Sequence, residues 1–336
     1  MATPSKKITA PRATKITMQL SVLLTMVRHT LENYPQLYLG ALMGFQDDDG
    51  NIDITHAYPF PYADQYEGGL FRLRLGAKYQ QDILAQLRKL GYGVEFHGWF
   101  QLSILGNFVT SQLVEGLAQQ QLQNPDAFVV VHNLAYLKEV DVKAYRLLQG
   151  FLQSYVDGKW KLKDLAANGV NYLSIFDEVP IDLGSQTMVE LYMALNTGAD
   201  GHITLSKRGG SASDILNLSL DENFTAQLLE LLYSQIDAYN YDQNNFNYYQ
   251  RQYQKELQKI AQWKQQRKLE NFERQKRGEK ELDPEEYTTL FKLPQEPSRY
   301  NNMLHSHAID TLADDILKKC DEELTKSQVI ERKMLA

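Results

Sequence analysis

Strand-like segments stop well before the end of this chain, and only helical patterns follow. Residues 14 to about 200 mix short apolar runs of strand length with amphipathic stretches at helical spacing. After the Gly- and Ser-rich KRGGSASD, every apolar pattern has the helical period. We therefore predict an α/β (α+β) domain over 14–205 and a helical assembly region over 219–336. A linker over 206–218 and a flexible N-terminal tail over 1–13 complete the organisation.

Within the first domain the order of elements can be predicted. Two strand-like runs flank the turn-rich DDDGN and predict a β-hairpin, and the first of them is apolar enough to be covered on both faces. The residues between Pro180 and the linker add another helix over 185–195. The other expected elements are helices over 20–31, 77–90 and 107–121, and strands over 92–103, 127–132, 142–148 and 171–183.

Composition narrows the class of protein. The 336 residues carry a formal net charge of -7, which argues against a generally basic nucleic-acid binder. One cysteine, Cys320, excludes an intramolecular disulfide, and the first residues lack the apolar run of a secretory signal. No apolar stretch is as long as the roughly 18 residues that a membrane span needs. On these grounds we expect a cytosolic or nuclear protein with no membrane contact.

Two apolar stripes mark the C-terminal region. A Ser-x-x-Glu capping box at 219–222 opens a long helix, with poor helix propensity and therefore a weak or bent point expected at 240–245. Another amphipathic helix ends the chain. Stripes of this kind need a cover, either the chain's own long helix or another subunit. Where helices from several subunits form a bundle, we expect buried contacts at Leu228, Leu232, Ile236, Ile309, Leu312 and Ile316.

The segment Arg251 to Lys280 is locally basic on an acidic chain. Residues 251 to 281 hold ten Lys or Arg against five Glu, with aromatic residues interleaved. A solvated helix face whose aromatic residues pack on neighbouring helices explains this pattern best, and a peripheral RNA contact stays open.

The stretch GWFQLSILGNFVTSQLV resembles the metal-binding core of the MPN (JAB1/MPN/Mov34) family, whose fold is a mixed β-sheet flanked by helices. In active members two histidines on a strand and an aspartate on the next helix hold zinc, and a glutamate on an earlier strand activates water. The matching positions here are Gln101, Ser103 and Val114, with Leu37 at the glutamate and Ser111 retained at the family's serine.

Those replacements remove the chemistry. Zinc is held by thiolate, imidazole or carboxylate groups, and without it no bound water becomes a hydroxide near neutral pH. We therefore expect no metal, no cofactor and no catalysis. A zinc site displaced onto His97 and His132 is the less favoured alternative, and the His305–His307 pair lies at a helix start, where residues two apart diverge.

The wider resemblance is to the family of the H subunit of eukaryotic translation initiation factor 3. It is carried by Gly106-Asn107-Phe108-Val109-Thr110, by Phe176-Asp177-Glu178-Val179-Pro180-Ile181 and, outside the MPN domain, by Arg277-Gly278-Glu279 and Leu290-Phe291-Lys292. It implies a non-catalytic subunit that pairs with the F subunit, another MPN protein, joins PCI subunits through a helical bundle and reaches the small ribosomal subunit. A scaffold subunit of the proteasome lid or signalosome is the alternative.

Overall fold

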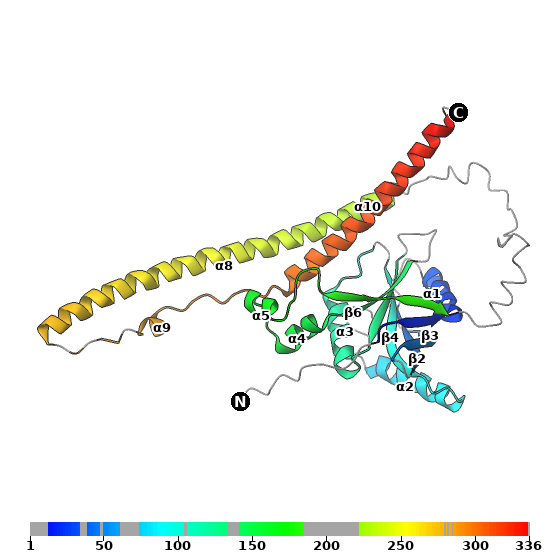
Figure 1. The fold of residues 1–336 in the computed structure, drawn as a ribbon, viewed down its shortest axis with the longest axis horizontal. Coiled ribbons are helices and arrows are strands. Elements are labelled where there is room, and N and C mark those ends of the chain that lie inside the picture. The colour runs from blue at the N-terminus through cyan, green and yellow to red at the C-terminus, as the bar shows by residue number, and fades with distance from the viewer. Residues whose placement is uncertain are drawn as a thin grey trace, which may run out of the picture.

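A mixed α/β domain carries two long helices, α8 and α10, that extend away from it (Figure 1). The structure is a computed structural model, and the residues it describes are 13–33, 39–47, 50–60, 74–103, 106–133, 141–184, 222–278, 280, 282–283 and 285–334. Residues 1–12 of the predicted tail, the predicted linker, residues 219–221 of the capping box and the helix expected over 185–195 lie outside these ranges.

One sheet of eight strands forms the centre of the domain, in the order β7-β6-β5-β4-β2-β3-β1-β8. The predicted hairpin is confirmed, because β2 and β3 pair antiparallel across the DDDGN segment. The pairs β1–β3, β1–β8 and β4–β5 are parallel, so the sheet is mixed. The strands are β1 (Ile16–Gln19), β2 (Leu39–Gln46), β3 (Ile52–Pro59), β4 (Glu95–Ser103), β5 (Phe128–Asn133), β6 (Asp141–Leu147), β7 (Phe176–Val179) and β8 (Ile181–Gly184).

The strand-like run expected over 171–183 divides into two strands at opposite edges of the sheet. Only Pro180 separates β7, which pairs with β6, from β8, which pairs with β1. The backbone carbonyl of Pro180 accepts a hydrogen bond of 3.1 Å from the N–H of Ile16 on β1. Because consecutive Cα atoms are about 3.8 Å apart, the two edges must meet here, so the sheet curls back on itself.

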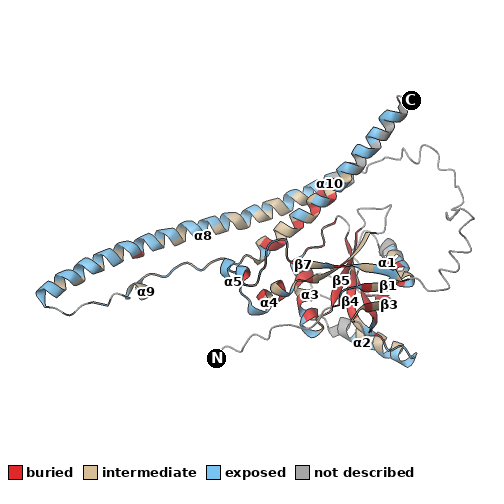
Figure 2. Ribbon diagram, in the orientation of Figure 1, coloured by how far each residue is buried: buried red, intermediate tan, exposed pale blue. Residues whose placement is uncertain are grey.

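Helices cover both faces of this curled sheet, and the buried residues lie between the layers (Figure 2). Helix α1 (Leu20–Asn33) packs on one face, while α3 (Ser111–Gln123), α4 (Gln149–Asp157) and α5 (Leu162–Ala167) pack on the other. Helices α4 and α5 are short and were not predicted from the sequence. Strand β2 is covered on both faces as expected, because Leu42 lies in the α1 core and Met43 packs toward α2 (Arg74–Lys89).

Helix α8 (Glu222–Arg277) runs without interruption through the predicted weak point at 240–245. A tertiary contact supports it there, because the side-chain amide of Gln243 donates to the Tyr239 hydroxyl at 3.0 Å and to Asn302 on α10 at 3.5 Å. The chain returns along α8 through α9 (Tyr287–Leu290) and enters α10 (Tyr300–Met334). The predicted pair of amphipathic C-terminal helices is confirmed, and neither these helices nor the others in the described ranges could span a membrane.

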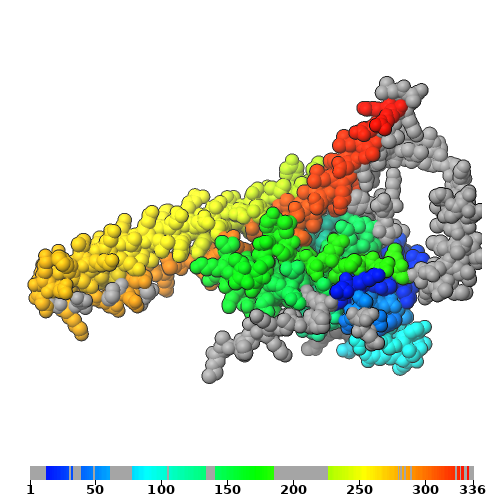
Figure 3. Space-filling model, in the orientation of Figure 1, coloured from blue at the N-terminus to red at the C-terminus, as the bar shows by residue number. Residues whose placement is uncertain are grey.

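The first half of α10 belongs to the core of the α/β domain. Met303, Leu304 and Ala308 are 6%, 5% and 1% exposed and lie in the same buried cluster as Trp99 and Val131 of the sheet. The space-filling view shows α10, in orange and red, lying along the surface of residues 141–184, in green (Figure 3). Part of the helical region is thus covered by the α/β domain of its own chain, a contact that the sequence pattern did not indicate.

Candidate functional site

Strand β4 carries two of the positions that would hold zinc in an active MPN enzyme. Successive residues of a strand alternate between faces, so Gln101 and Ser103 share the face of Trp99, which packs against α3 and α10. Gln101 is half-buried beside Leu39 and Val131 in the sheet. Ser103 is 1% exposed, and its hydroxyl has no hydrogen-bond partner in the described residues.

Helix α3 supplies two further positions of the family pattern, Ser111 and Val114. Thr110 caps it, since the Thr110 hydroxyl accepts a hydrogen bond of 3.2 Å from the N–H of Leu113. The helix consequently begins at Ser111, four residues later than the start predicted at Asn107, and the cap at Thr110 was the sequence signal for this start. Val114 is fully buried in the cluster that holds Trp99, whereas Ser111 is exposed.

The structure therefore brings Gln101, Ser103 and Val114 to one side of the sheet, but with donors unsuited to zinc. An amide, a hydroxyl and an isopropyl group replace two imidazoles and a carboxylate. The apolar side chain of Val114 has no atom that could coordinate a cation. No group of three His, Cys, Asp or Glu in the described part of the chain could hold a metal ion. Leu37, the remaining position, lies outside the described residues.

The two buried histidines lie apart from this constellation. His132 pairs with Leu102 in the sheet, on the face opposite to Gln101 and Ser103. His97 is 3% exposed and lies where the β2–β4 register shifts. Burial lowers the pKa of both imidazoles, so each is neutral at pH 7.

The His305–His307 pair diverges around α10. The ring of His305 lies within 2.8 Å of the Gln235 amide oxygen on α8. The ring of His307 instead lies 5.4 Å from the ring of Phe176 on β7, and burial lowers its pKa. Two imidazoles that face different neighbours cannot meet at one ion, so this His-x-His sequence is not a metal motif.

A polar contact joins α10 to the sheet at the end of β5. The side-chain amide of Asn133 donates to Asp315 on α10 at 3.4 Å, and both residues are 9% exposed. Gly106 leaves the space that Asp315 occupies, because a Cβ at Gly106 would lie 2.2 Å from the Asp315 carboxylate. Gly106 also has φ of 77°, a conformation that favours glycine. The junction thus depends on residues from three separate segments.

The predicted bundle contacts lie along the α8–α10 pair. Leu228 and Leu312 are 2% and 0% exposed, so their burial is completed within this chain. The remaining four side chains are only half-buried: Leu232, Ile236, Ile309 and Ile316. Covering of these four by other subunits stays a prediction.

Several cations of Arg251 to Lys280 contact aromatic rings of the same region. The Lys264 ammonium lies 3.9 Å from the ring centre of Tyr287, and the Arg267 guanidinium lies 4.6 Å from that of Trp263. Arg267 also forms an ion pair with Glu286 on the returning chain. These contacts agree with aromatic residues packing along a charged helix. They also show that some of the basic side chains already interact with rings and carboxylates of the same chain.

Comparison with known proteins identifies the family. The family model described as the C-terminal region of eIF3h matches residues 138–333. The H subunit of eukaryotic translation initiation factor 3 from Yarrowia lipolytica is 32% identical, over 87% of this chain and 91% of the relative. The chain belongs to the eIF3h family.

Membership in the eIF3h family extends along the chain. The relatives from Aspergillus terreus and Pyricularia oryzae, both with the same name, are 26% and 27% identical over 89% and 88% of this chain. These matches also cover 90% and 89% of the relatives, so the α/β domain and the helices are shared. A solution structure of a Desulfitobacterium hafniense protein, with 18% identity and a TM-score of 0.33 over 51% of this chain and 94% of that one, is too distant to carry an argument.

Proposed function

We propose that the chain is a non-catalytic structural subunit of eukaryotic translation initiation factor 3 that supports preinitiation complex formation on the small ribosomal subunit. Membership in the eIF3h family is the observation that carries this proposal. A cytoplasmic location follows from that role. The names of the relatives do not support the alternative of a proteasome lid or signalosome subunit.

The absence of catalysis is supported by the site. Gln101, Ser103 and Val114 stand where an isopeptidase needs zinc ligands, and α10 packs into the same cluster as Val114. A displaced zinc site receives no support from His97 and His132, since no group of three His, Cys, Asp or Glu side chains in the described residues could hold a metal ion. Elemental analysis and a ubiquitin-chain cleavage assay test this directly. Stoichiometric zinc together with cleavage would overturn the non-catalytic role.

Assembly through the C-terminal helices and the MPN domain is the second part of the proposal. Helix α8 exposes large apolar side chains, among them Tyr241 at 68% and Leu269 at 66%, which a bundle with PCI subunits would cover. Helix α2 buries its apolar face only in part, since Ile83 and Leu87 stay half-exposed. This incomplete cover suits pairing of the domain with the F subunit.

A gradient experiment tests the assembly role. The tagged full-length chain should sediment with initiation factor 3 and the small ribosomal subunit, whereas a variant with Tyr241→Glu and Leu269→Glu should leave those fractions and sediment as the free chain. The control is Lys163→Glu, at an exposed position of the domain. Equal sedimentation of the two variants would contradict assembly through α8. Cross-linking of ribosomal RNA to Arg251 to Lys280 would establish the peripheral RNA contact.

A further inference from the structure

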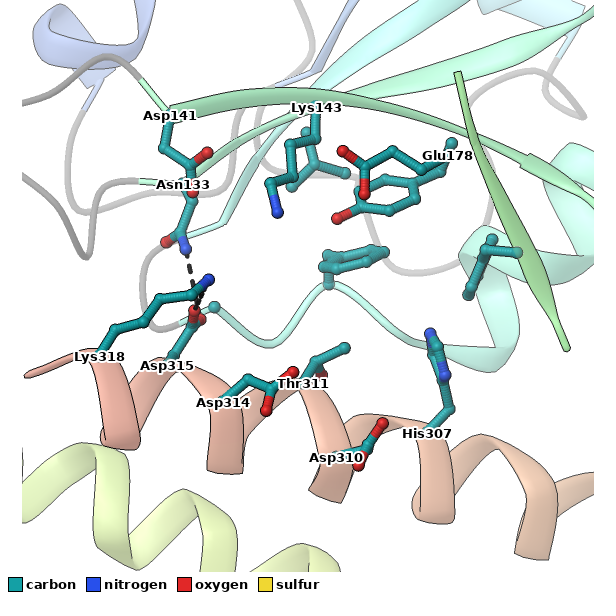
Figure 4. Close-up of a pocket in the computed structure, with 15 residues that line it drawn as sticks. Asn133, Asp141, Lys143, Glu178, His307, Asp310, Thr311, Asp314, Asp315 and Lys318 are labelled. Carbon is teal, nitrogen blue, oxygen red and sulfur yellow. Dashed lines mark hydrogen bonds and ion pairs between the residues drawn. The ribbon is translucent and has the colours of Figure 1, made fainter. Parts of the chain in front are cut away.

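A cleft of about 270 Å³ lies between α10 and the sheet, beside the junction of Asn133 and Asp315 (Figure 4). Asp141, Lys143 and Tyr145 occupy every second position of β6, so their side chains share the face that lines the cleft. Glu178 on β7 is the register partner of Tyr145 and lies on the same face. The sheet side of the cleft is thus both charged and aromatic.

The aromatic part of the wall is ordered by ring contacts. Phe108 stacks on Tyr145 with ring centres 4.7 Å apart and an interplanar angle of 20°. Phe176 contacts both rings at 5.8 and 5.9 Å. Burial raises the pKa of the Tyr145 phenol, and the nearby Glu178 carboxylate adds to the effect. The hydroxyl therefore stays protonated in a negative environment.

Helix α10 forms the opposite wall and makes the cleft acidic. Asp310 and Asp314 are exposed and form no ion pair with any described residue, whereas Lys318 pairs with Asp315 at 3.8 Å. The complete lining holds the carboxylates of Asp141, Glu178, Asp310, Asp314 and Asp315 against the ammonium groups of Lys143 and Lys318. The excess of negative charge favours a cation.

The exposed face of α10 continues this surface away from the domain. Leu317 and Leu324 are 61% and 59% exposed, and they follow Asp314 at helical spacing with Asp321 between them. A partner that combines apolar and basic residues would complement both the exposed leucines and the acidic side chains of this face. No described residue of this chain covers that face at Leu317 or Leu324.

We infer that the cleft and the exposed face of α10 together bind a basic, partly apolar segment of another protein subunit, with one arginine side chain inserted among the carboxylates that line the cleft. Arginine suits the cleft better than lysine, because its planar guanidinium pairs with carboxylates through two hydrogen bonds and stacks on aromatic rings. Nucleic acid does not suit it, since phosphates meet excess negative charge.

This inference deepens the proposed function and rests on it for the statement that the partner is a subunit of the same assembly. The recognition chemistry itself can be measured on the isolated full-length chain. The probe is the blocked tripeptide acetyl-Gly-Arg-Gly-amide, compared with the same peptide carrying citrulline, which keeps the shape of arginine and removes its charge.

We expect the arginine peptide to shift the NMR amide signals of Thr311 to Asp315 and of Lys143 to Tyr145 in a saturable manner. The corresponding lysine peptide, acetyl-Gly-Lys-Gly-amide, should bind more weakly, and the citrulline peptide should not bind. Neutralising two exposed carboxylates with Asp310→Asn and Asp314→Asn should weaken arginine binding about tenfold or more. The matched control is Glu230→Gln with Asp237→Asn, two exposed acids on α8.

Several results would overturn the inference. These are equal shifts with the citrulline peptide, equal affinity of the doubly neutralised α10 variant and the control, or binding of a short RNA at the same amides. In the assembled complex, benzoylphenylalanine at Thr311 should cross-link to a partner segment that contains arginine, and a cross-link to RNA would refute the choice of partner. If the chain is absent from initiation factor 3 while the peptide still binds, the proposed function fails and the cleft chemistry stands.

Discussion

Helix α10 is predicted to stabilise the α/β domain, and Leu304→Ala measures how much. The substitution removes three carbon atoms from a side chain that is 5% exposed in the core. At about 0.8 kcal/mol for each buried methylene, the lost transfer free energy is about 2.4 kcal/mol. The cavity left behind adds to this, so we expect the free energy of unfolding to fall by about 2–4 kcal/mol.

Urea unfolding followed by tryptophan fluorescence reports this loss where it occurs. Trp99 lies in the same buried cluster as Leu304, and the ring of Trp160 lies 4.8 Å from that of Tyr300 at the start of α10. The matched control is Leu317→Ala on the same helix, because Leu317 is 61% exposed. Truncation of an exposed side chain should change stability by no more than about 0.5 kcal/mol. Equal losses in the free energy of unfolding for the two substitutions would refute the packing of α10 in the core of the α/β domain.

Three further predictions concern the junction, the buried histidines and the returning chain. Gly106→Ala should lower stability by about 1–3 kcal/mol in thermal melts. The reason is that Gly106 has φ of 77° and that a Cβ added there would lie 2.2 Å from the Asp315 carboxylate on α10. The control is Gly93→Ala, because a Cβ added at Gly93 would have no atom within 4 Å. Burial lowers the pKa of His97 below 6.5, so as the pH falls the unfolded state binds a proton before the folded state does. The free energy of unfolding should therefore decrease as the pH drops through 6.5. An unchanged pH dependence in His97→Gln would exclude this cause. Asn271 bonds both the N–H and the carbonyl of Leu282 at 3.0 Å. Asn271→Ala should therefore speed hydrogen exchange of the Leu282 amide roughly tenfold, and an unaltered rate would show that the chain is held elsewhere.

Local patterns predicted most elements of the fold. The DDDGN turn between apolar runs specified the β2–β3 hairpin, and helical spacing located α1, α2 and the two long helices. Turn residues and apolar period act over a few neighbours, so they are readable from sequence. The division of the 171–183 run at Pro180 was not readable, because the pairing of β7 with β6 and of β8 with β1 depends on strands far away in the chain.

The sequence predicted which residues occupy the zinc-ligand positions, but it did not predict that α10 packs beside them. Strand parity placed Gln101 and Ser103 on one face, and the spacing brought Val114 near them. The docking of α10 escaped prediction because Met303, Leu304 and Ala308 lie beside the stripe of Ile309, Leu312 and Ile316, and an apolar stripe does not say which surface covers it. Asp315 was likewise missed, since a lone acid on a helix is usually solvated.

Mass spectrometry of the complexes that co-purify with the tagged, full-length chain tests the central claim most directly. If the chain is a structural subunit of initiation factor 3, the other subunits of that factor, including the F subunit, should be recovered in equimolar amounts, with the small ribosomal subunit at low salt. Recovery of proteasome lid or signalosome subunits, or of the chain without partners, would contradict the account.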